Sequence, residues 1–292
     1  MLNRMNKTKK ESLERAIKRA EKNKWLKRYF NGIYLIGREN IASIKNEQFI
    51  AFSNHLSHWD YIQLGYLFVR ELPLERFPTI IAGKNLDRKL LQLIGLDFKS
   101  MGALFVDREK INSERKEKKK PYLNELSQKI AFTINQGENL LDFPEGGRNY
   151  SSKSVGPFKN GTLREILESK KDLYILNMAV DYDFRIEEDY FKLLKKTKSH
   201  KVLRPMYYLL DAIAFIIEPT RMRIKNQRGN SYISIQKPKK LYEIINSSDN
   251  FNKAREKLKT YITEGVTEAY QKIQKFKLEL YSGSSCLGEK IY

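Results

Sequence analysis

A histidine and an aspartate stand five residues apart in the stretch FSNHLSHWDY, residues 52–61. A neutral imidazole can accept a proton from an alcohol near pH 7, and a carboxylate bonded to its other ring nitrogen fixes the tautomer and stabilises the imidazolium that forms. His55 and Asp60 could therefore act as a general base and its orienting partner. The nucleophile would be a hydroxyl of the substrate, which suits acyl transfer rather than hydrolysis. Taken alone, the pair is equally compatible with a polar turn that caps a helix.

Two further stretches each place an arginine at the end of an apolar strand. The first reads GALFVDR and ends at Arg108, and the second reads LLDFPEGGR and ends at Arg148. A guanidinium can bind a phosphate through two hydrogen bonds, and adjacent glycines let backbone N–H groups approach an anion closely. Each stretch, considered singly, is also compatible with an ordinary surface turn.

In this order, NHLSHWD, GALFVDR and FPEGGR resemble the three signature blocks of the glycerophospholipid acyltransferases, the glycerol-3-phosphate and 1-acylglycerol-3-phosphate O-acyltransferases. The resemblance covers residues 32–241, and a fourth, looser block corresponds to YILNMAV at residues 174–180. It implies an enzyme of phospholipid synthesis. Such an enzyme moves a fatty acyl group from an acyl thioester, of CoA or of acyl carrier protein, to a hydroxyl of glycerol 3-phosphate or 1-acylglycerol 3-phosphate.

The resemblance also implies roles for single residues. His55 would be the general base on the acceptor hydroxyl, and Asp60 would orient it. Arg108 would hold the phosphate of the acceptor. The remaining residues that would bind the acceptor come from the third block: Glu145, Gly146 and Arg148. No metal and no tightly bound cofactor is implied, because the thioester is a co-substrate.

Two positions depart from the family pattern. The third block reads EGGR, where many 1-acylglycerol-3-phosphate acyltransferases have threonine before the arginine, and a second glycine is more typical of the glycerol-3-phosphate branch. The proline that is usual in the fourth block is absent from NMAV at residues 177–180, so we assign no site residue there. The acceptor stays open between the two compounds, with glycerol 3-phosphate favoured.

Strand-like apolar runs alternate with helical stretches along the chain, which is typical of an α/β fold. We predict a single acyltransferase domain at residues 31–245, with a central mixed, largely parallel sheet flanked by helices and the site at the strand ends. A basic helical extension would precede it at residues 1–30. A helical segment and tail would follow at residues 246–292.

The chain of 292 residues has a formal net charge of +20, which calls for an anionic partner. A phosphate-bearing acceptor, the thioester donor and an anionic membrane surface all satisfy this requirement. Nucleic acid is a rival partner, but the sequence has no zinc-finger spacing, RNA-binding aromatic motif or evident helix-turn-helix. The other alternative is a lipid-binding protein that keeps the acyltransferase fold without activity.

The expected location is the cytoplasm, with peripheral attachment to the membrane. The single cysteine, Cys286, fits a reducing compartment, and no stretch offers the roughly 20 uninterrupted apolar residues of a spanning helix. Residues 11–30 have helical character and many lysines and arginines, so they would form either an interfacial helix on anionic lipid or a solvated leader. Residues 202–217, the most apolar stretch, predict a core-packed or interfacial helix. No cysteine and histidine cluster predicts a metal site.

Overall fold

The computed structural model describes residues 2–22, 26, 30–57, 59–87, 97–111, 116–149, 155–159, 161–184, 229–283 and 288–291. Several features of the sequence lie outside this part of the chain: His58, Lys153, Cys286 and the apolar stretch 202–217. The predicted domain limits at residues 30 and 245 stay a prediction.

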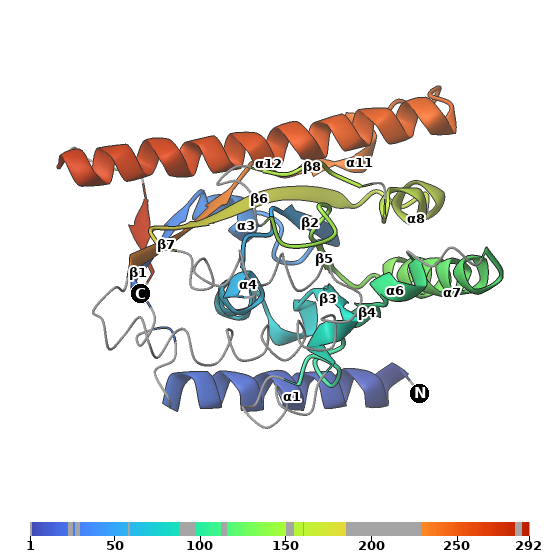
Figure 1. The fold of residues 1–292 in the computed structure, drawn as a ribbon, viewed down its shortest axis with the longest axis horizontal. Coiled ribbons are helices and arrows are strands. Elements are labelled where there is room, and N and C mark those ends of the chain that lie inside the picture. The colour runs from blue at the N-terminus through green and yellow to red at the C-terminus, as the bar shows by residue number, and fades with distance from the viewer. Residues whose placement is uncertain are drawn as a thin grey trace, which may run out of the picture.

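A mixed sheet forms the centre of the described structure (Figure 1). Its strands are β1 (Phe30–Ile36), β2 (Phe49–Ser53), β3 (Thr79–Gly83), β4 (Leu104–Val106), β5 (Leu140–Asp142), β6 (Tyr174–Tyr182), β7 (Gly229–Ile235), β8 (Lys239–Lys240) and β9 (Glu289–Lys290). They follow the order β4-β3-β5-β2-β6-β7-β1-β9, and β8 pairs with β6. The run from β4 to β6 is parallel throughout. The α/β class with a mixed, largely parallel sheet is therefore confirmed.

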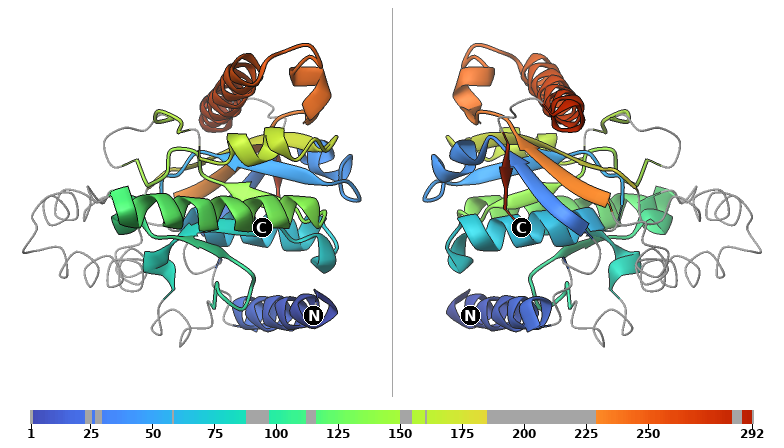
Figure 2. Two further views of the ribbon diagram at one scale, coloured as in Figure 1. Left: turned by 90° about the vertical axis from the view of Figure 1, so that its right-hand side faces the viewer. Right: turned by 90° about the vertical axis from the view of Figure 1, so that its left-hand side faces the viewer.

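Helices cover both faces of this sheet. They are α1 (Leu2–Lys22), α3 (Arg38–Ala42), α4 (Trp59–Glu71), α6 (Arg108–Ile111), α7 (Lys116–Asn135), α8 (Leu163–Glu168), α11 (Leu241–Ile244) and α12 (Phe251–Ser282), with short 3-10 turns at Leu74–Arg76 and Lys84–Leu86. In Figure 1 and Figure 2, α12 lies above the sheet, while α4 and then α1 lie below it.

The strand residues alternate between two cores, as the two-residue period of a strand requires. In β2, Phe49 and Ala51 pack in the core that includes Leu64 and Leu67 of α4. Ile50 and Phe52 pack in the opposite core, with residues of α7, α8 and α12. Because both faces of β2 are buried, its C-terminal end is held rigidly between two layers.

The predicted end of the N-terminal helical segment differs from the structure. The N-terminal helix α1 begins at Leu2 and ends at Lys22, whereas Phe30, predicted to be helical, begins β1. Pro121 lies inside α7. Proline removes one backbone hydrogen bond, and the turns on either side of it are retained here. Among the described helices, none combines the length and the apolar character needed to cross a membrane.

Candidate active site

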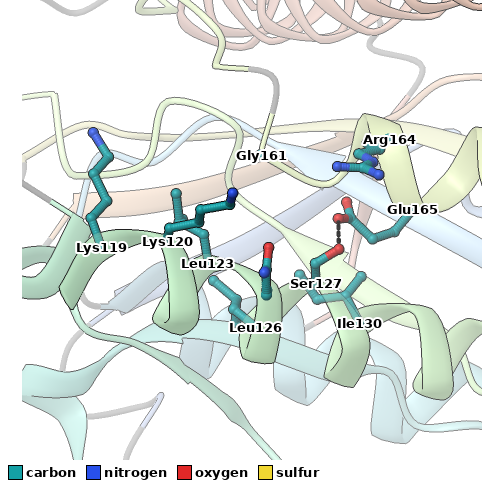
Figure 3. Close-up of a pocket in the computed structure, with 10 residues that line it drawn as sticks. Lys119, Lys120, Leu123, Leu126, Ser127, Ile130, Gly161, Arg164 and Glu165 are labelled. Atoms are coloured by element: carbon teal, nitrogen blue, oxygen red, sulfur yellow. Dashed lines mark hydrogen bonds between the residues drawn. The ribbon is translucent and has the colours of Figure 1, made fainter. Parts of the chain in front are cut away.

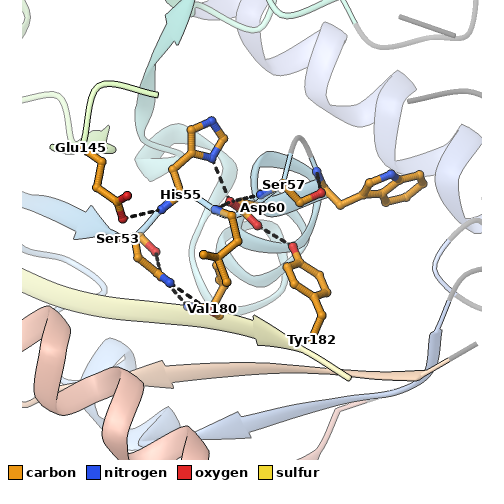
Figure 4. A network of polar contacts seen from close by, with 10 residues as sticks. Ser53, His55, Ser57, Asp60, Glu145, Val180 and Tyr182 are labelled. Atoms are coloured by element: carbon orange, nitrogen blue, oxygen red, sulfur yellow. Dashed lines mark hydrogen bonds and ion pairs between the residues drawn. The ribbon is translucent and has the colours of Figure 1, made fainter. Parts of the chain in front are cut away.

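The turn between β2 and α4 carries His55 and ends in the first turn of α4, where Asp60 lies. Nδ1 of His55 and Oδ2 of Asp60 are 2.8 Å apart. The same carboxylate oxygen accepts the backbone N–H groups of Leu56 at 2.7 Å and Ser57 at 3.0 Å. Both N–H groups belong to the turn that precedes α4, so the carboxylate holds this turn against the start of the helix. The fold thus sets the distance between the histidine and the aspartate, and the predicted pair is formed (Figure 4).

Tyr182, the last residue of β6, completes the environment of the aspartate. Its hydroxyl donates to Oδ1 of Asp60 at 2.5 Å, and its ring stacks on Phe30 with 5.9 Å between centroids. The two oxygens of Asp60 therefore receive different partners, Oδ2 facing His55 and Oδ1 facing Tyr182. The sequence did not indicate Tyr182, since it lies beyond the fourth block at residues 174–180 and belongs to no motif.

Asn54 fastens the turn to the neighbouring strand. Its side-chain amide donates to the carbonyl of Val180 at 3.0 Å, and its side-chain oxygen accepts the N–H of Val180 at 2.8 Å. One side chain thereby continues the backbone pairing of β2 with β6 past the end of β2. The residue before His55 is fixed, so the imidazole leaves the sheet in a defined direction.

The third block wraps around the same turn. Oε1 of Glu145 accepts the backbone N–H of His55 at 3.1 Å, and the backbone N–H of Asn149 donates to the carbonyl of His55 at 2.8 Å. Gly146 has φ 65°, in the left-handed region that favours glycine, and its N–H closes a turn onto Phe143 at 2.8 Å. The observed contact of Glu145 is thus with the backbone of the histidine, while its predicted role toward an acceptor stays a prediction.

Aromatic rings surround the imidazole. The His55 ring lies 4.6 Å from the ring of Phe143 and 5.1 Å from that of Tyr61, and the histidine is 3 % exposed. Burial lowers the pKa of His55 from its ordinary value, and its interaction with Asp60 opposes this shift. The imidazole is therefore neutral near pH 7. Burial also raises the pKa of the Tyr61 phenol, so this hydroxyl stays protonated.

Cationic side chains gather beside the imidazole. Arg148, which is buried, and Arg108 both act to lower the pKa of His55 by charge repulsion. A Cβ placed on Gly147 would lie 3.2 Å from Nη1 of Arg108, and one on Gly146 would lie 3.1 Å from Nζ of Lys159. The structure therefore brings the second and third blocks together, as expected.

The second glycine of EGGR has a structural consequence. Any side chain at Gly147 would crowd the guanidinium of Arg108, because even a Cβ there approaches Nη1 closely. Lys84 pairs with Asp107 at 3.1 Å, and its side chain is 60 % exposed. No group of three or more His, Cys, Asp or Glu side chains suited to a metal is found within the described ranges.

Residues 32–181 match the family model described as Acyltransferase, which is more than half of the chain. The chain belongs to the acyltransferase family. The protein is thus an acyltransferase enzyme, and the matched range includes every site residue predicted from the three blocks. A search of curated proteins gives no match.

A solved structure of similar fold is the crystal structure of the 1-acyl-sn-glycerophosphate (LPA) acyltransferase, PlsC, from Thermotoga maritima. The two chains share 17 % identity and superpose with a TM-score of 0.50, over 91 % of this chain and 79 % of that one. At this sequence identity, the similarity between the two chains is one of fold.

Proposed function

We propose that this acyltransferase moves a fatty acyl group from an acyl thioester to a hydroxyl of glycerol 3-phosphate or 1-acylglycerol 3-phosphate, in phospholipid synthesis. The observation that carries the proposal is the buried His55–Asp60 pair, joined at 2.8 Å beside two arginines. The pair supplies a base for an alcohol, and the arginines supply charge for a phosphate on the same molecule.

His55 acts as the general base. The carboxylate of Asp60 accepts a hydrogen bond from Nδ1–H of His55, so Nε2 is the basic nitrogen toward the acceptor hydroxyl. Nε2 takes the hydroxyl proton as the acceptor oxygen forms a bond to the thioester carbonyl carbon. The tetrahedral intermediate then collapses, the carbon–sulfur bond breaks, and the leaving thiolate takes the proton back from the imidazolium. No acyl-enzyme forms, and no metal or tightly bound cofactor enters the proposed cycle.

The acceptor is held by its phosphate. Arg108 and Arg148 lie close enough to His55 to depress its pKa, so a phosphate bound by them brings an adjacent hydroxyl near the imidazole. Gly146 has no side chain that would hold the backbone away from this phosphate. The side chain of Lys159 lies beside Gly146. Glu145 contributes by holding the His55 backbone.

Two observations on the acylation state of the acceptor point in opposite directions. EGGR favours glycerol 3-phosphate, because a second glycine before the arginine is more typical of the glycerol-3-phosphate branch of the family. The PlsC structure of similar fold, by contrast, belongs to an enzyme that acts on 1-acyl-sn-glycerophosphate. Both acceptors therefore belong in the experiment. The donor thioester is carried by CoA or by acyl carrier protein.

We further propose peripheral attachment to an anionic membrane surface from the cytoplasmic side. The net charge of +20 supports it, since each lysine or arginine near such a surface contributes about 1 kcal/mol of attraction. The acyl product of the reaction also resides in a membrane.

The test is acceptor-dependent thiol release in the presence of anionic vesicles. Acyl-CoA and acyl carrier protein donors would be combined with glycerol 3-phosphate, with 1-acylglycerol 3-phosphate and with monoacylglycerol, which lacks the phosphate. Release that requires a phosphorylated acceptor supports the proposal and identifies the acceptor. Equal release with monoacylglycerol, or none with any acceptor, would overturn it.

A further inference from the structure

The histidine and the long helix α12 lie on opposite faces of the sheet. The His55 ring contacts Phe143 and Tyr61, which belong to the core that includes residues of α4. The other face carries α12, and also a pocket of about 430 Å³ between α7 and α8, which Ile130 of the opposite core lines (Figure 3). Any effect of this face on the imidazole must therefore pass through a strand of the sheet.

The end of β6 provides such a connection. Successive strand residues point to opposite faces, so Asp181 faces α12 while Tyr182 faces the core that includes α4. The Tyr182 hydroxyl donates to Oδ1 of Asp60 at 2.5 Å (Figure 4). The carboxylate that orients His55 is thus in contact with a strand end whose neighbouring residues face α12.

Lys277 of α12 holds this strand end from the far side. Its Nζ is 3.0 Å from Oδ2 of Asp181, donates to the backbone carbonyl of Tyr182 at 3.1 Å, and lies 3.7 Å from Oδ1 of Asp183. The lysine side chain is 17 % exposed and that of Asp181 is 6 % exposed. Pairs with so little exposure are screened by salt much less than surface pairs. One lysine therefore contacts three consecutive residues, with Tyr182 in the middle.

Neighbouring side chains keep this lysine in place. Nζ of Lys277 lies 4.9 Å from the centroid of the Tyr232 ring, a distance at which a cation is attracted to an aromatic face. The Tyr232 hydroxyl donates to Oδ1 of Asp183 at 2.8 Å. Nε2 of Gln274, also on α12, donates to Oδ2 of Asp181 at 2.8 Å. The lysine thus lies between a ring and two carboxylates that have further partners of their own.

We propose that Lys277 is a positioning residue of the acyl transfer, an inference that rests on the proposed function. By holding the backbone of Tyr182 from the far face, it sets the distance between the Tyr182 hydroxyl and Asp60. Asp60 in turn fixes the direction of the His55 ring. The stacking of Tyr182 on Phe30 does not set this distance, because a stacked pair tolerates sliding of one ring over the other.

The test variant is Lys277→Met, which keeps much of the volume of the side chain and removes its charge. A buried carboxylate left without its cation destabilises a fold, so a second variant combines Lys277→Met with Asp181→Asn and removes both charges of the closest pair.

The matched control is Lys272→Met on the same helix. Lys272 donates to Oε1 of Gln236 at 2.8 Å, and the backbone N–H of Gln236 donates to the carbonyl of Asn177. This lysine therefore contacts the sheet beside the first half of β6, away from its end at Tyr182.

Steady-state kinetics measure the effect on turnover. We expect kcat to fall about fivefold in both Lys277 variants, because a displaced catalytic group slows the chemical step. KM for the acceptor should stay nearly unchanged, since the arginines bind its phosphate. Lys272→Met should keep the native kcat. An unchanged kcat in both Lys277 variants, or an equal fall in the control, would overturn the proposal.

A double-mutant cycle shows whether Lys277 acts through Tyr182. In the Tyr182→Phe background the hydroxyl that contacts Asp60 is absent, so adding Lys277→Met should leave kcat nearly unchanged. A role confined to stability would lower the free energy of unfolding without such coupling in kcat. A fall of about fivefold in both backgrounds would therefore overturn the proposal.

The bond between His55 and Asp60 is observed by NMR without any turnover. The proton on Nδ1 gives a far-downfield signal while this bond protects it from exchange with water, and His55→Ala assigns the signal. It should be sharp in the native protein and in Lys272→Met, and should broaden through faster exchange in both Lys277 variants.

This measurement separates the inference from the proposed function. Broadening confined to the Lys277 variants, in a protein that shows no acyl transfer, would leave the positioning role standing while the proposed function fails. Acyl transfer by the native enzyme, together with a sharp signal in the Lys277 variants, would overturn the positioning role alone.

Discussion

At the scale of single residues, the Asp60 side chain links α4, the turn that carries His55, and β6. Its carboxylate accepts from His55 and two backbone N–H groups through Oδ2, and from Tyr182 through Oδ1. Each partner comes from a different part of the turn or from β6, so the carboxylate can hold only one orientation. This orientation fixes the imidazole, because a hydrogen bond of 2.8 Å to Nδ1 determines where Nε2 points.

Tyr182→Phe tests whether Tyr182 positions this pair. The change removes the hydroxyl and keeps the ring that stacks on Phe30. We expect kcat to fall about tenfold, since a hydrogen bond to a charged group contributes about 1.5–3 kcal/mol and only part of it acts in the transition state. KM for the acceptor should change little. An unchanged kcat in steady-state kinetics would contradict a positioning role.

The pH dependence of kcat/KM follows from the environment of His55. Burial lowers the pKa of His55 below the ordinary value of 6.5, so the base is neutral above that pH and loses activity only as pH falls through the lowered value. The acidic limb of the profile should therefore bend below pH 6.5. Asp60 acts to raise this pKa, so in Asp60→Asn the residual activity should bend at still lower pH. A limb that moves upward in this variant would contradict the assignment.

At the scale of elements, the close contact of α12 with β6 fixes one side of the domain. A Cβ on Gly265 would come 2.0 Å from Nδ2 of Asn177, and that amide donates to the carbonyl of Tyr261 at 3.2 Å. The helix can approach the sheet this closely only because residue 265 has no side chain. β6, which ends at Tyr182, is thus supported from the face opposite α4.

Gly265→Ala should destabilise the fold. Alanine is the better helix former by about 1 kcal/mol, but the clash with Asn177 requires α12 to shift, and overpacking of a core costs about 1–3 kcal/mol. We expect a lower free energy of unfolding in urea. The matched control is Gly65→Ala in α4, whose Cβ would lie 3.9 Å from its nearest neighbour and should be neutral or stabilising. Equal stability of the two variants would contradict the packing argument.

The sequence predicted the elements that carry regular patterns. The apolar run of β2 and the helical stretch that follows it are legible in the sequence, because strand and helix have different periods. The three motif blocks likewise predicted that His55, Asp60, Arg108 and Arg148 would meet.

Contacts between distant residues without a pattern could not be predicted. Tyr182 bonds to Asp60 across 122 positions, and no local signal marks either the pair or its geometry. Glu145 was assigned to the acceptor from its motif, yet its oxygen meets the backbone of His55, which only the folded chain can reveal. The helical extension predicted up to residue 30 ran too far, since Phe30 already belongs to β1.

At the scale of the whole molecule, the excess of positive charge is the dominant property. The chain carries 55 lysines and arginines against 35 aspartates and glutamates. Two of these cations, Arg108 and Arg148, lie near His55. The other lysines and arginines attract the protein to an anionic surface, and dissolved salt weakens this attraction by screening the charges.

Vesicle binding tests this property. The protein should bind vesicles containing anionic lipid in low salt and release them as salt is raised, whereas zwitterionic vesicles should bind weakly at both. Sedimentation with vesicles measures the bound fraction. Equal binding to both lipid types, insensitive to salt, would mean that apolar insertion rather than charge holds the protein on the membrane.

The central claim, that His55 is the base of an acyl transfer, is tested most directly by His55→Ala. Thiol release from an acyl thioester would be measured with and without a glycerol phosphate acceptor, on protein shown by thermal unfolding to be folded. Loss of a general base predicts a fall in acceptor-dependent release of about 10²–10⁴-fold, with acceptor binding retained through the arginines. Acceptor-dependent release at the native rate would contradict the mechanism.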